Sequence, residues 1–476
     1  MNNLSTKDII NNSTIMFGTS GARGMVEAFT DLVVRAYVSN FVTVVSKSKK
    51  TDEVFIAIDN RPSSYGIALS CANALKNLGV NYRFYGVIPT PALAYHSLSK
   101  GVPAIMVTGS HIPFDRNGLK FYTSTGEITK QDELDITNCD IPLNDCENVE
   151  TLTIDESAKE NYIARYTRFF PADCLKGLRI GIYEHSSSGR DVYPSIFEKL
   201  GATVISLGRT QAFVPIDTEA VSEEDKQKAR DWRNQFNLNA IFSTDGDGDR
   251  PLLTDENGEW LRGDILCILT AIALGVKAVA TPVSSNTLLN QCCKFDEVLY
   301  TKIGSPYVID GLSTLISRHE TVAGFEANGG FILASAIRQG DNFIGPLPTR
   351  DSVLPALVVL AAYAKTGIKA ALNLLPQRYT YSDRIQAFPS HESTRLISLG
   401  KDKPEELLIY LGLNVGLDKV DYTDGVRMTL TDSSILHLRA SGNAPELRIY
   451  AEASEESSAK ELVLSCKEKL KHLSLT

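Results

Sequence analysis

The sequence predicts an α/β protein with three similar α/β domains that contain mixed sheets, followed by a C-terminal α+β domain. Short apolar runs alternate with longer amphipathic segments from about residue 54 to residue 325, as strands alternate with helices. Three of the predicted strands end in loops rich in polar side chains, which suggests one domain plan used three times. Beyond Pro376 the pattern changes to short strands and a final helix.

Length and charge limit the organisation of the chain and its partners. A chain of 476 residues is too long for one core, and 43% hydrophobic with 22% charged residues is ordinary for a globular enzyme. The net charge of -9 argues against nucleic acid or an anionic membrane as a partner, because both need an extended basic face. A small anionic substrate could still be held by a few local cations.

Cysteine usage and apolar runs indicate the compartment. The eight cysteines form no C-x-x-C pair, and the adjacent Cys292 and Cys293 lack the spacing of zinc ligands. The first residues are polar and do not resemble a signal peptide. The most apolar runs, residues 265–274 and 354–363, are about ten residues long, whereas a membrane span needs roughly 20. These features predict a cytoplasmic protein with reduced thiols.

The first alternation leads to a loop that contains Ser110. This serine follows a buried strand at its carboxyl end, where open α/β sheets place their chemistry. Gly109 lets the backbone turn sharply, Pro113 delays any helix, and His111 puts an imidazole beside the hydroxyl. The elements predicted before the loop are strands at residues 54–59, 81–87 and 103–107 and a helix at residues 64–78.

Two segments bring positive charge toward this loop. Asn117 and Gly118 predict a second turn, which would return Lys120 to the vicinity of Ser110. The glycine-rich residues 16–24 include Arg23, but their spacing is not the dinucleotide fingerprint. That segment fits a plain turn or a phosphate contact.

The second alternation leads to a cluster of carboxylates. Asp245, Asp247 and Asp249 alternate with glycines directly after a predicted strand, so the backbone can curl the three side chains around one point. Two unit charges about 4 Å apart repel by roughly 4 kcal/mol at an effective dielectric constant near 20, and a divalent cation would remove that repulsion. The elements of this region are strands at residues 178–183, 203–207 and 238–243 and helices at residues 192–200 and 219–234.

The identity of the cation follows from the ligand type. Oxygen ligands favour magnesium or calcium over zinc. The three aspartates and Glu256 match the spacing of a calcium EF-hand, but Arg250 occupies the position that needs glycine and a strand, not a helix, leads into the loop. We therefore expect Mg²⁺, which also pairs naturally with phosphate.

The third alternation and the C-terminal domain each supply one further polar loop. Glu326 and Asn328 are spaced to bind adjacent sugar hydroxyls, although an ordinary glycine turn has the same pattern. Between two late strands, Arg439 and the small polar residues after it form a possible phosphate cradle. The predicted elements are helices at residues 265–274, 285–293, 307–317, 351–364 and 457–470 and strands at residues 276–281, 297–302, 321–325, 427–430, 435–439 and 447–451.

Together these loops resemble the α-D-phosphohexomutases along essentially the whole chain. Several motifs in the right order are far more specific than any one of them. The resemblance is carried by Thr19-Ser20-Gly21-Ala22-Arg23-Gly24, Thr108-Gly109-Ser110-His111-Ile112-Pro113, Asn117-Gly118-Leu119-Lys120, Asp245-Gly246-Asp247-Gly248-Asp249-Arg250, Glu326-Ala327-Asn328-Gly329-Gly330 and Arg439-Ala440-Ser441-Gly442-Asn443.

The resemblance implies four domains around a central cleft and a role for each motif. The domains would be a phosphoserine domain (1–155), a metal-binding domain (156–262), a sugar-binding domain (263–375) and a phosphate-binding domain (376–476). Carried over to this sequence, the metal ligands are phosphorylated Ser110 with Asp245, Asp247 and Asp249. The implied substrate-binding residues are Glu326, Asn328, Lys302, Arg439, Ser441, Gly442, Asn443 and Arg448.

The implied reaction interconverts hexose 1-phosphate and hexose 6-phosphate. Phosphoserine 110 would donate its phosphoryl group, and the resulting hexose 1,6-bisphosphate, which also serves as the activator, would turn around and return its other phosphate. Arg23, Lys120 and Arg250 would supply positive charge, and either Lys120 or His111 would handle the hydroxyl proton. We expect a phosphorylated hexose as the only partner of a monomer or weak homodimer.

Departures from the usual motifs leave the sugar open. Asn328 replaces the usual serine of the sugar loop, Gly109 replaces an alanine and Ile112 replaces an asparagine. Mannose phosphate is the first choice, followed by glucose phosphate and glucosamine phosphate. A magnesium-dependent sugar phosphatase is an alternative, although a phosphatase has no use for a second phosphate cradle.

Overall fold

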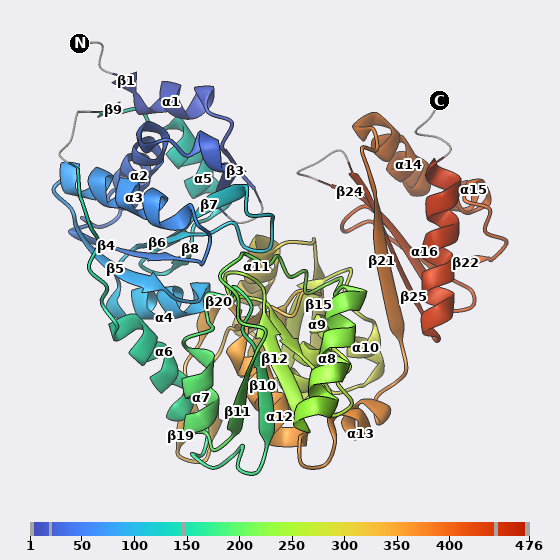
Figure 1. Cartoon of the computed structure of the whole chain (residues 1–476). Coiled ribbons are helices and arrows are strands. Elements are labelled where there is room, and N and C mark those ends of the chain that lie inside the picture. The colour runs from blue at the N-terminus through green and yellow to red at the C-terminus, as the bar shows by residue number, and fades with distance from the viewer. Residues whose placement is uncertain (1–3, 19–20, 144–147, 442–445, 472–476) are drawn as a thin grey trace. The chain divides into compact units, whose positions relative to one another are not determined.

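The computed structural model describes residues 4–18, 21–143, 148–441 and 446–471 (Figure 1). The chain forms two compact units. The first unit comprises Met1–Gly275 with Asn328–Lys369, and the second comprises Val276–Ala327 with Ala370–Thr476. The first unit therefore contains the loops of Ser110 and Asp245, whereas the second contains Arg439.

A mixed sheet with the strand order β2-β3-β7-β6-β4-β5 organises the start of the first unit. The strands β5, β4 and β6 run parallel, and β7 runs antiparallel to β6. Figure 1 shows α2 and α3 on one face of this sheet and α4 on the other, which explains why β6 is buried at every position. The strands are β2 (Met16–Phe17), β3 (Ala22–Met25), β4 (Glu53–Ile58), β5 (Asn81–Val87), β6 (Ala104–Val107), β7 (Arg116–Thr123) and β8 (Gly126–Glu127), and the helices are η1 (Val26–Ala28), α2 (Asp31–Val45), α3 (Ser64–Asn77) and α4 (Thr90–Lys100).

The strand β7 (Arg116–Thr123) corrects the prediction of a turn at Asn117 and Gly118. Lys120 returns toward the loop of Ser110 because it pairs with Met106 in the antiparallel ladder of β6 and β7. A β-carbon at position 118 would lie 2.8 Å from a neighbouring carbonyl oxygen. The glycine is therefore needed for the close approach of backbones and not for a turn.

The N-terminal segment packs beside this first domain. The short strands β1 and β9 pair antiparallel, and α1 contacts α2 and α5. These elements are β1 (Leu4–Ser5), α1 (Thr6–Asn12), α5 (Lys130–Asn138) and β9 (Pro142–Leu143).

The second α/β domain repeats the strand order of the first. Its sheet has the order β11-β10-β12-β13, which matches β5-β4-β6-β7, and its last strand is again antiparallel. The loop of Asp245 follows β12 just as the loop of Ser110 follows β6. The elements are α6 (Ser157–Thr167), β10 (Arg179–Tyr183), α7 (Tyr193–Lys199), β11 (Thr203–Leu207), α8 (Glu223–Phe236), β12 (Ala240–Thr244) and β13 (Pro251–Leu253).

The remainder of the first unit combines two apolar helices with short strands. Helix α9 packs against α12, and both are apolar around most of their circumference, as expected for core helices. Strand β20, which the sequence analysis did not predict, ends where α12 begins. The elements are α9 (Gly263–Leu274), β17 (Phe331–Leu333), β18 (Ile337–Gln339), β19 (Asn342–Ile344), β20 (Leu347–Asp351), α12 (Val353–Tyr363) and, at the boundary of the units, α13 (Ile368–Asn373).

The second unit begins with the third repeat. Its parallel strands have the order β15-β14-β16, so that β16 occupies the position of β6 and β12. Helix α11 packs on β14 and β16, and the predicted helix at residues 285–293 is shorter in the structure. The elements are β14 (Ala278–Pro282), α10 (Leu288–Gln291), β15 (Glu297–Thr301), α11 (Ser305–Ile316) and β16 (Val322–Phe325).

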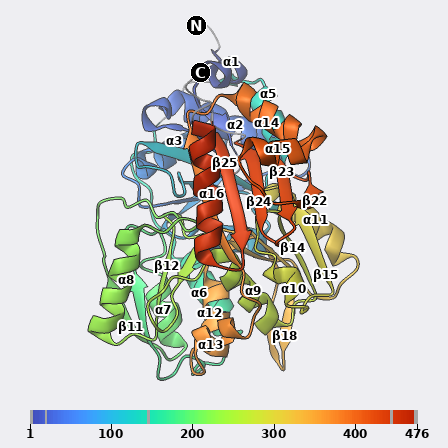
Figure 2. The same cartoon turned by 90° about the vertical axis from the view of Figure 1, so that its right-hand side faces the viewer.

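An antiparallel sheet with the order β21-β25-β24-β23-β22 completes the second unit. Helix α16 lies along β25 (Figure 2) and contacts β21 as well. This arrangement confirms the prediction of three similar α/β domains followed by an α+β domain. The elements are β21 (Tyr379–Gln386), α14 (Ser390–Asp402), α15 (Pro404–Tyr410), β22 (Leu417–Asp421), β23 (Val426–Leu430), β24 (Ile435–Ala440), β25 (Glu446–Ala453) and α16 (Glu456–Lys471). Within the described ranges, every helix is too short or too polar to span a bilayer.

Candidate active site

Ser110 lies just past β6 in a strained backbone conformation. Its φ of 57° falls in the left-handed region, which residues other than glycine rarely adopt and which is common at functional sites. Its backbone N–H donates to Thr108 Oγ1 at 2.8 Å, and its buried hydroxyl donates to Asp245 Oδ2 at 3.1 Å. The structure therefore aims the serine hydroxyl at the aspartate loop of the second domain.

Gly109 has a different role from the predicted one. The left-handed residue of the loop is Ser110, so the sharp turn does not depend on glycine at position 109. A β-carbon at position 109 would instead lie 2.7 Å from Cζ of Arg61. This glycine leaves room for a guanidinium group under the loop.

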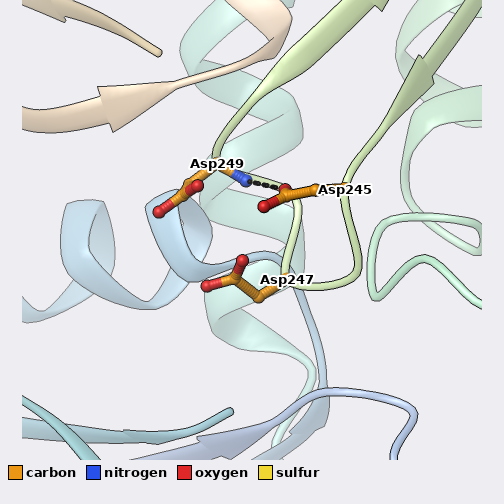
Figure 3. Close-up of side chains that lie close together, drawn as sticks. All are labelled: Asp245, Asp247 and Asp249. Atoms are coloured by element: carbon orange, nitrogen blue, oxygen red, sulfur yellow. Dashed lines mark hydrogen bonds between the residues drawn. The ribbon is translucent and has the colours of Figure 1, made fainter. Parts of the chain in front are cut away.

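Three aspartates converge after β12 (Figure 3), and one of them, Asp245, accepts a hydrogen bond from Ser110. Asp245, Asp247 and Asp249 are fully buried, and each offers a carboxylate oxygen within 4.8 Å of the others. The loop is folded back on itself because the backbone N–H of Asp249 donates to Asp245 Oδ1 at 3.2 Å. The predicted carboxylate cluster is thus present in the first unit.

Two buried cationic side chains bond the Oδ2 atoms of Asp247 and Asp249. Lys120 Nζ lies 2.5 Å from Asp247 Oδ2 and 2.9 Å from Asp249 Oδ2. Arg350, at the end of β20, donates from Nη2 to the same Asp249 oxygen at 2.8 Å. Lys120 and Arg350 therefore offset part of the repulsion among the carboxylates. The sequence analysis expected a divalent cation to remove that repulsion.

Arg250, His111 and Arg23 complete the charged site. Arg250 donates from Nη1 to His111 Nδ1 at 2.8 Å, and its Nε lies 3.7 Å from Asp249 Oδ1. His111 Nδ1 also lies 3.4 Å from Ser110 Oγ. The charge of Arg250, then burial and the charge of Arg23, lower the pKa of His111 to about 2, so the ring is neutral. Burial, with the charges of Arg250 and Arg350, lowers the pKa of Arg23 to about 10.

The three carboxylates differ in how easily they ionise. Burial, followed by the charges of Asp247 and Asp249, raises the pKa of Asp245 well above its usual range. Burial also opposes ionisation of Asp247, but Lys120, Thr90 and Arg350 together outweigh it and the pKa of Asp247 is lowered. Arg350 has the largest opposing effect at Asp249, whose pKa is likewise lowered. Two anions are thus stabilised, and the third needs a further cation.

The donor set fits a hard divalent metal ion. Asp247 Oδ1 and Asp249 Oδ1 are buried and accept no hydrogen bond from any residue that the structure describes. Lys120 and Arg350 occupy the other oxygens, so these two remain available as ligands. Oxygen-only ligands of this kind suit magnesium. Ser110 Oγ and Asp245 could complete the set.

In the second unit one carboxylate joins two predicted substrate-binding segments. Asp424 Oδ2 accepts from Arg439 Nε at 2.8 Å and from the backbone N–H of Ile303 at 2.9 Å. Lys302, beside Ile303, lies 5.8 Å from the centre of the Tyr307 ring. Arg439 and the segment of Lys302 therefore share a single anchor.

Arg439 also belongs to a row of arginines across the C-terminal sheet. It pairs directly with Arg448 on β25, and Arg448 pairs with Arg384 on β21. Directly opposed residues in antiparallel strands point to the same face, so three guanidinium groups share one side of the sheet. The backbone N–H of Ser441 donates to Glu446 O at 2.9 Å. Gly442 and Asn443, both predicted to bind phosphate, lie outside the described residues.

The predicted sugar loop follows β16. Glu326 and Asn328 are both buried. Asn328 Oδ1 accepts from the backbone N–H of Gly330 at 3.0 Å, and its backbone oxygen accepts from Thr218 Oγ1 at 3.0 Å. The carbonyl of the Asn328 side chain therefore stabilises its own turn.

The sequence analysis missed several residues of the site. Arg350 lies near the end of β20, a strand that was not predicted. In this region the sequence pattern indicated only the apolar helix that follows the strand. Thr90, the first residue of α4, donates from Oγ1 to Asp247 Oδ2 at 2.8 Å. Arg61 lies just beyond β4, and the rule that strand ends carry chemistry could have identified it.

Comparison with known protein families gives three matches along the chain. Residues 14–139 match the model of phosphoglucomutase/phosphomannomutase alpha/beta/alpha domain I, and residues 262–380 match domain III. Residues 397–468 match the C-terminal domain of the same family. The resemblance inferred from the motifs is confirmed.

Curated relatives cover nearly the whole chain. A phosphomannomutase from Salmonella muenchen is 52% identical over 96% of this chain and 96% of the relative. A phosphomannomutase from Sinorhizobium fredii is 40% identical over 94% of this chain and 97% of its own length. A phosphoglucosamine mutase from Bdellovibrio bacteriovorus is 27% identical over 93% of this chain and 95% of its own.

Solved structures share the fold. A putative phosphomannomutase from Thermus thermophilus superposes with a TM-score of 0.76 at 18% identity, covering 96% of this chain and 99% of the other. A phosphoglucomutase/phosphomannomutase family protein from Burkholderia thailandensis has a TM-score of 0.73 at 19% identity, covering 95% of this chain and 97% of the other. The fold of the whole chain is therefore one already known.

Proposed function

Since the chain belongs to the phosphoglucomutase/phosphomannomutase family, we propose that it interconverts mannose 1-phosphate and mannose 6-phosphate through phosphorylated Ser110 and a bound mannose 1,6-bisphosphate. It is a phosphohexomutase, an isomerase that moves a phosphoryl group between two oxygens of one sugar. The observation that carries the choice of sugar is the 52% identity to a phosphomannomutase, against 27% to a phosphoglucosamine mutase.

The geometry around Ser110 supports its role as the phosphoryl carrier. In the first half-reaction a sugar hydroxyl oxygen forms a bond to phosphorus while the bond from Ser110 Oγ to phosphorus breaks. The sugar hydroxyl loses its proton and Ser110 Oγ gains one, so the atoms balance. After the sugar bisphosphate has turned around, the same exchange runs in reverse at the other phosphate. Catalysis of this kind is mostly positioning and charge neutralisation.

The balance of charge supports a phosphorylated Ser110 at this site. Four cationic side chains act on one another or on the three aspartates among the described residues of the first unit. A phosphoserine carries a charge of about -1.5 to -2 at neutral pH, so an arrangement with this much positive charge can accept it. These side chains are Arg23, Lys120, Arg250 and Arg350.

Two side chains are candidates for moving the proton. His111 Nδ1 lies 3.4 Å from Ser110 Oγ. Lys120 is an ammonium group held by Asp247 and Asp249, whose charges outweigh burial and raise its pKa. Lys120 is therefore suited to stabilising charge, and the lowered pKa of His111 makes its neutral ring a weak proton acceptor beside the serine.

Magnesium and a sugar bisphosphate complete the proposal. Asp245, Asp247, Asp249 and Ser110 Oγ would hold Mg²⁺. When bound, the ion supplies positive charge to the phosphoryl oxygens. Hexose 1,6-bisphosphate would serve as the activator because it can phosphorylate Ser110. In the second unit, Arg439 and Arg448 would bind the phosphate that is not being transferred, and Glu326 with Lys302 would bind the sugar.

The reaction can be tested by following the sugar and the enzyme together. Purified protein is incubated with mannose 1-phosphate, Mg²⁺ and a trace of mannose 1,6-bisphosphate, and mannose 6-phosphate is measured by a coupled assay. The 1-phosphates of glucose and glucosamine serve as competitors. Intact-mass analysis before and after exposure to the bisphosphate measures phosphorylation of Ser110.

The expected result is formation of mannose 6-phosphate with the largest kcat/KM of the three sugars, and one added phosphoryl group that S110A lacks. Release of inorganic phosphate without mannose 6-phosphate would instead identify a phosphatase. A larger kcat/KM for another sugar would retain the mutase and change its substrate.

A further inference from the structure

We propose that Arg61 is the positioning residue of the catalytic serine, because its guanidinium group holds the entire loop of residues 110–116 through the backbone. The inference rests on the proposed role of Ser110 as phosphoryl carrier. Arg61 lies in the turn after β4, outside every motif that carries the resemblance to the family.

The hydrogen bonds of Arg61 use both ends of the guanidinium group. Nη2 donates to the carbonyl oxygens of Ser110 at 2.8 Å and Ile112 at 2.6 Å. Nη1 donates to the carbonyl oxygens of Pro113 at 2.7 Å and Arg116 at 3.2 Å. One planar cation therefore fixes four carbonyl groups spread over seven residues, a pattern that the fixed fork of arginine can make and a lysine cannot.

Arg61 is itself held in place by a buried carboxylate. Its Nε donates to Asp59 Oδ2 at 3.1 Å, and both side chains are 0% exposed. The same carboxylate accepts from Thr108 Oγ1 at 2.7 Å and from Ser64 Oγ at 2.6 Å. Thr108 Oγ1 in turn accepts from the backbone N–H of Ser110. Arg61 thus holds the carbonyl oxygen of Ser110, and Asp59 holds its backbone N–H through Thr108.

The second domain covers this arrangement. The ring of Phe213 lies over Arg61, with its centroid 4.0 Å from Cζ. Gly109 provides the space that Arg61 occupies, as shown by the 2.7 Å approach of a hypothetical β-carbon. A β-carbon at position 246 would lie 2.8 Å from the Ser110 carbonyl and 3.0 Å from Phe213. The guanidinium group therefore lies between the serine loop and an aromatic cover, away from water.

The loop needs such a support because it has little core of its own. Residues 113–116 are exposed, and the Phe114 side chain is 63% exposed. Apolar burial therefore cannot fix this segment, and Ser110 must still be kept in a left-handed conformation. Four charge-assisted hydrogen bonds from Arg61 supply that constraint. A displacement of the serine by about 1 Å can slow a positioned reaction by about 100-fold.

The test uses R61K, which keeps a positive charge beside Asp59 but cannot bind four carbonyls. Phosphorylation of Ser110 by mannose 1,6-bisphosphate is followed by rapid quenching and intact-mass analysis, together with kcat and KM. Amide hydrogen exchange is measured across the whole chain. We expect the phosphorylation rate and kcat to fall by about 100-fold, KM to change little, and faster exchange to be confined to residues 108–118.

Two further variants keep the test decisive if R61K fails to fold. G109A places a methyl group against Arg61 and should slow phosphorylation of Ser110 while leaving exchange elsewhere unchanged. In R61A, added guanidinium ion should restore part of the phosphorylation rate, whereas sodium chloride at equal concentration should not.

The outcomes separate this inference from the proposed function. A folded R61K enzyme that phosphorylates Ser110 at the wild-type rate would overturn the inference and leave the proposed function intact. Uniformly faster exchange in all variants, without rescue by guanidinium, would also overturn it, because Arg61 would then serve general stability. Failure of the wild-type protein to phosphorylate Ser110 would overturn the proposed function itself.

Discussion

The two regions that we propose to bind phosphate handle positive charge in opposite ways. In the first unit, Lys120 and Arg350 are buried and bonded to the carboxylates of Asp247 and Asp249, so cations and anions alternate. In the second unit, Arg384, Arg448 and Arg439 stand side by side on adjacent strands. Asp424 bonds Arg439 at one end of that row, and Glu446 lies 3.8 Å from Arg384 at the other.

This difference matches the physical setting of each region. A buried charge without a partner is costly, so the first region must balance its charges before any substrate arrives. Like charges directly opposed across strands destabilise a sheet. Water and salt screen Arg384, whose side chain is 54% exposed, more than Arg439, whose side chain is 17% exposed. The first region is suited to chemistry in a fixed environment, whereas the second is suited to capturing an anion from solution. Substitutions in the first should lower kcat, and those in the second should raise KM.

The largest effect is expected for S110G. Glycine accepts the φ of 57° without strain, so this variant removes the hydroxyl and leaves the backbone relaxed. We expect kcat to fall by at least about 10⁴-fold and the added phosphoryl mass to disappear. Thermal unfolding of S110G should match or exceed that of the wild type. Residual phosphorylation of the protein at another residue would contradict the assignment of the carrier.

A smaller loss is expected for R350M. This change leaves Asp249 with Lys120 but without its bond from Arg350 Nη2, so the carboxylate is less well oriented and less well neutralised. We expect kcat to fall by about 100-fold. We also expect weaker binding of Mn²⁺, which replaces Mg²⁺ and is measured by electron paramagnetic resonance. R350K is the matched control and should recover part of both. Unchanged metal binding and turnover in R350M would contradict the role of this arginine.

R439M should act on KM more than on kcat. Removal of the guanidinium group eliminates one of the proposed phosphate-binding groups, while Asp424 still accepts from Ile303 N. We expect KM for mannose 1-phosphate to rise by about 30-fold with a much smaller change in kcat. Steady-state kinetics of R439K should show an intermediate KM. A selective loss of kcat would remove the distinction between the two regions.

The free energy of unfolding should depend on pH through His437, which stacks on Tyr450 beside the arginine row. Burial, opposed by a bond to the backbone of Asp424, lowers its pKa from 6.5 to about 4. The folded state therefore binds fewer protons than the unfolded state between these values, and stability that is complete above pH 6.5 declines as the pH falls. From pH 7 to pH 5 this residue should cost about 2 kcal/mol, measured as the difference in urea unfolding between wild type and H437Q. Equal pH dependence in both proteins would contradict it.

The smallest effect is expected for R384M at the edge of the row. The Arg384 side chain is 54% exposed and lies 3.8 Å from Glu446, so its contribution should be largely screened. We expect KM to rise by only about two- to threefold at low salt and to match the wild type at high salt. The comparison needs kinetics at two ionic strengths. A salt-independent change would mean that Arg384 contacts the substrate phosphate directly.

The order of the elements and the loops of Ser110 and Asp245 could be predicted from the sequence, because each depends on a local sequence pattern. The apolar run before Ser110 and the alternating aspartates after β12 are visible without any tertiary information. The prediction of a turn at Asn117 and Gly118 was wrong because it used turn propensity alone. The pairing of β7 with β3 and β6 decides the conformation of these residues.

The position of Arg61 just beyond β4 could have marked it as a candidate. The roles of Arg350 and Arg61 could not be recognised, because those roles depend on tertiary contacts. Arg350 is brought to Asp249 from a position 101 residues later in the chain. Arg61 reaches four carbonyl groups that carry no side-chain signal at all. Backbone acceptors are the same for every residue type, so a sequence contains nothing that marks them as the target of a particular arginine.

The shared anchor at Asp424 has a consequence for redesign of sugar preference. Because one oxygen accepts from both Ile303 N and Arg439 Nε, the segment of Lys302 and the β24 strand cannot be exchanged independently. A graft of residues 302–304 from a relative should therefore include the turn at Asp424 and Gly425, where an added β-carbon would collide with the Leu438 carbonyl. Engineered chimeras that divide these segments between two parents should lose affinity even when both parents are active.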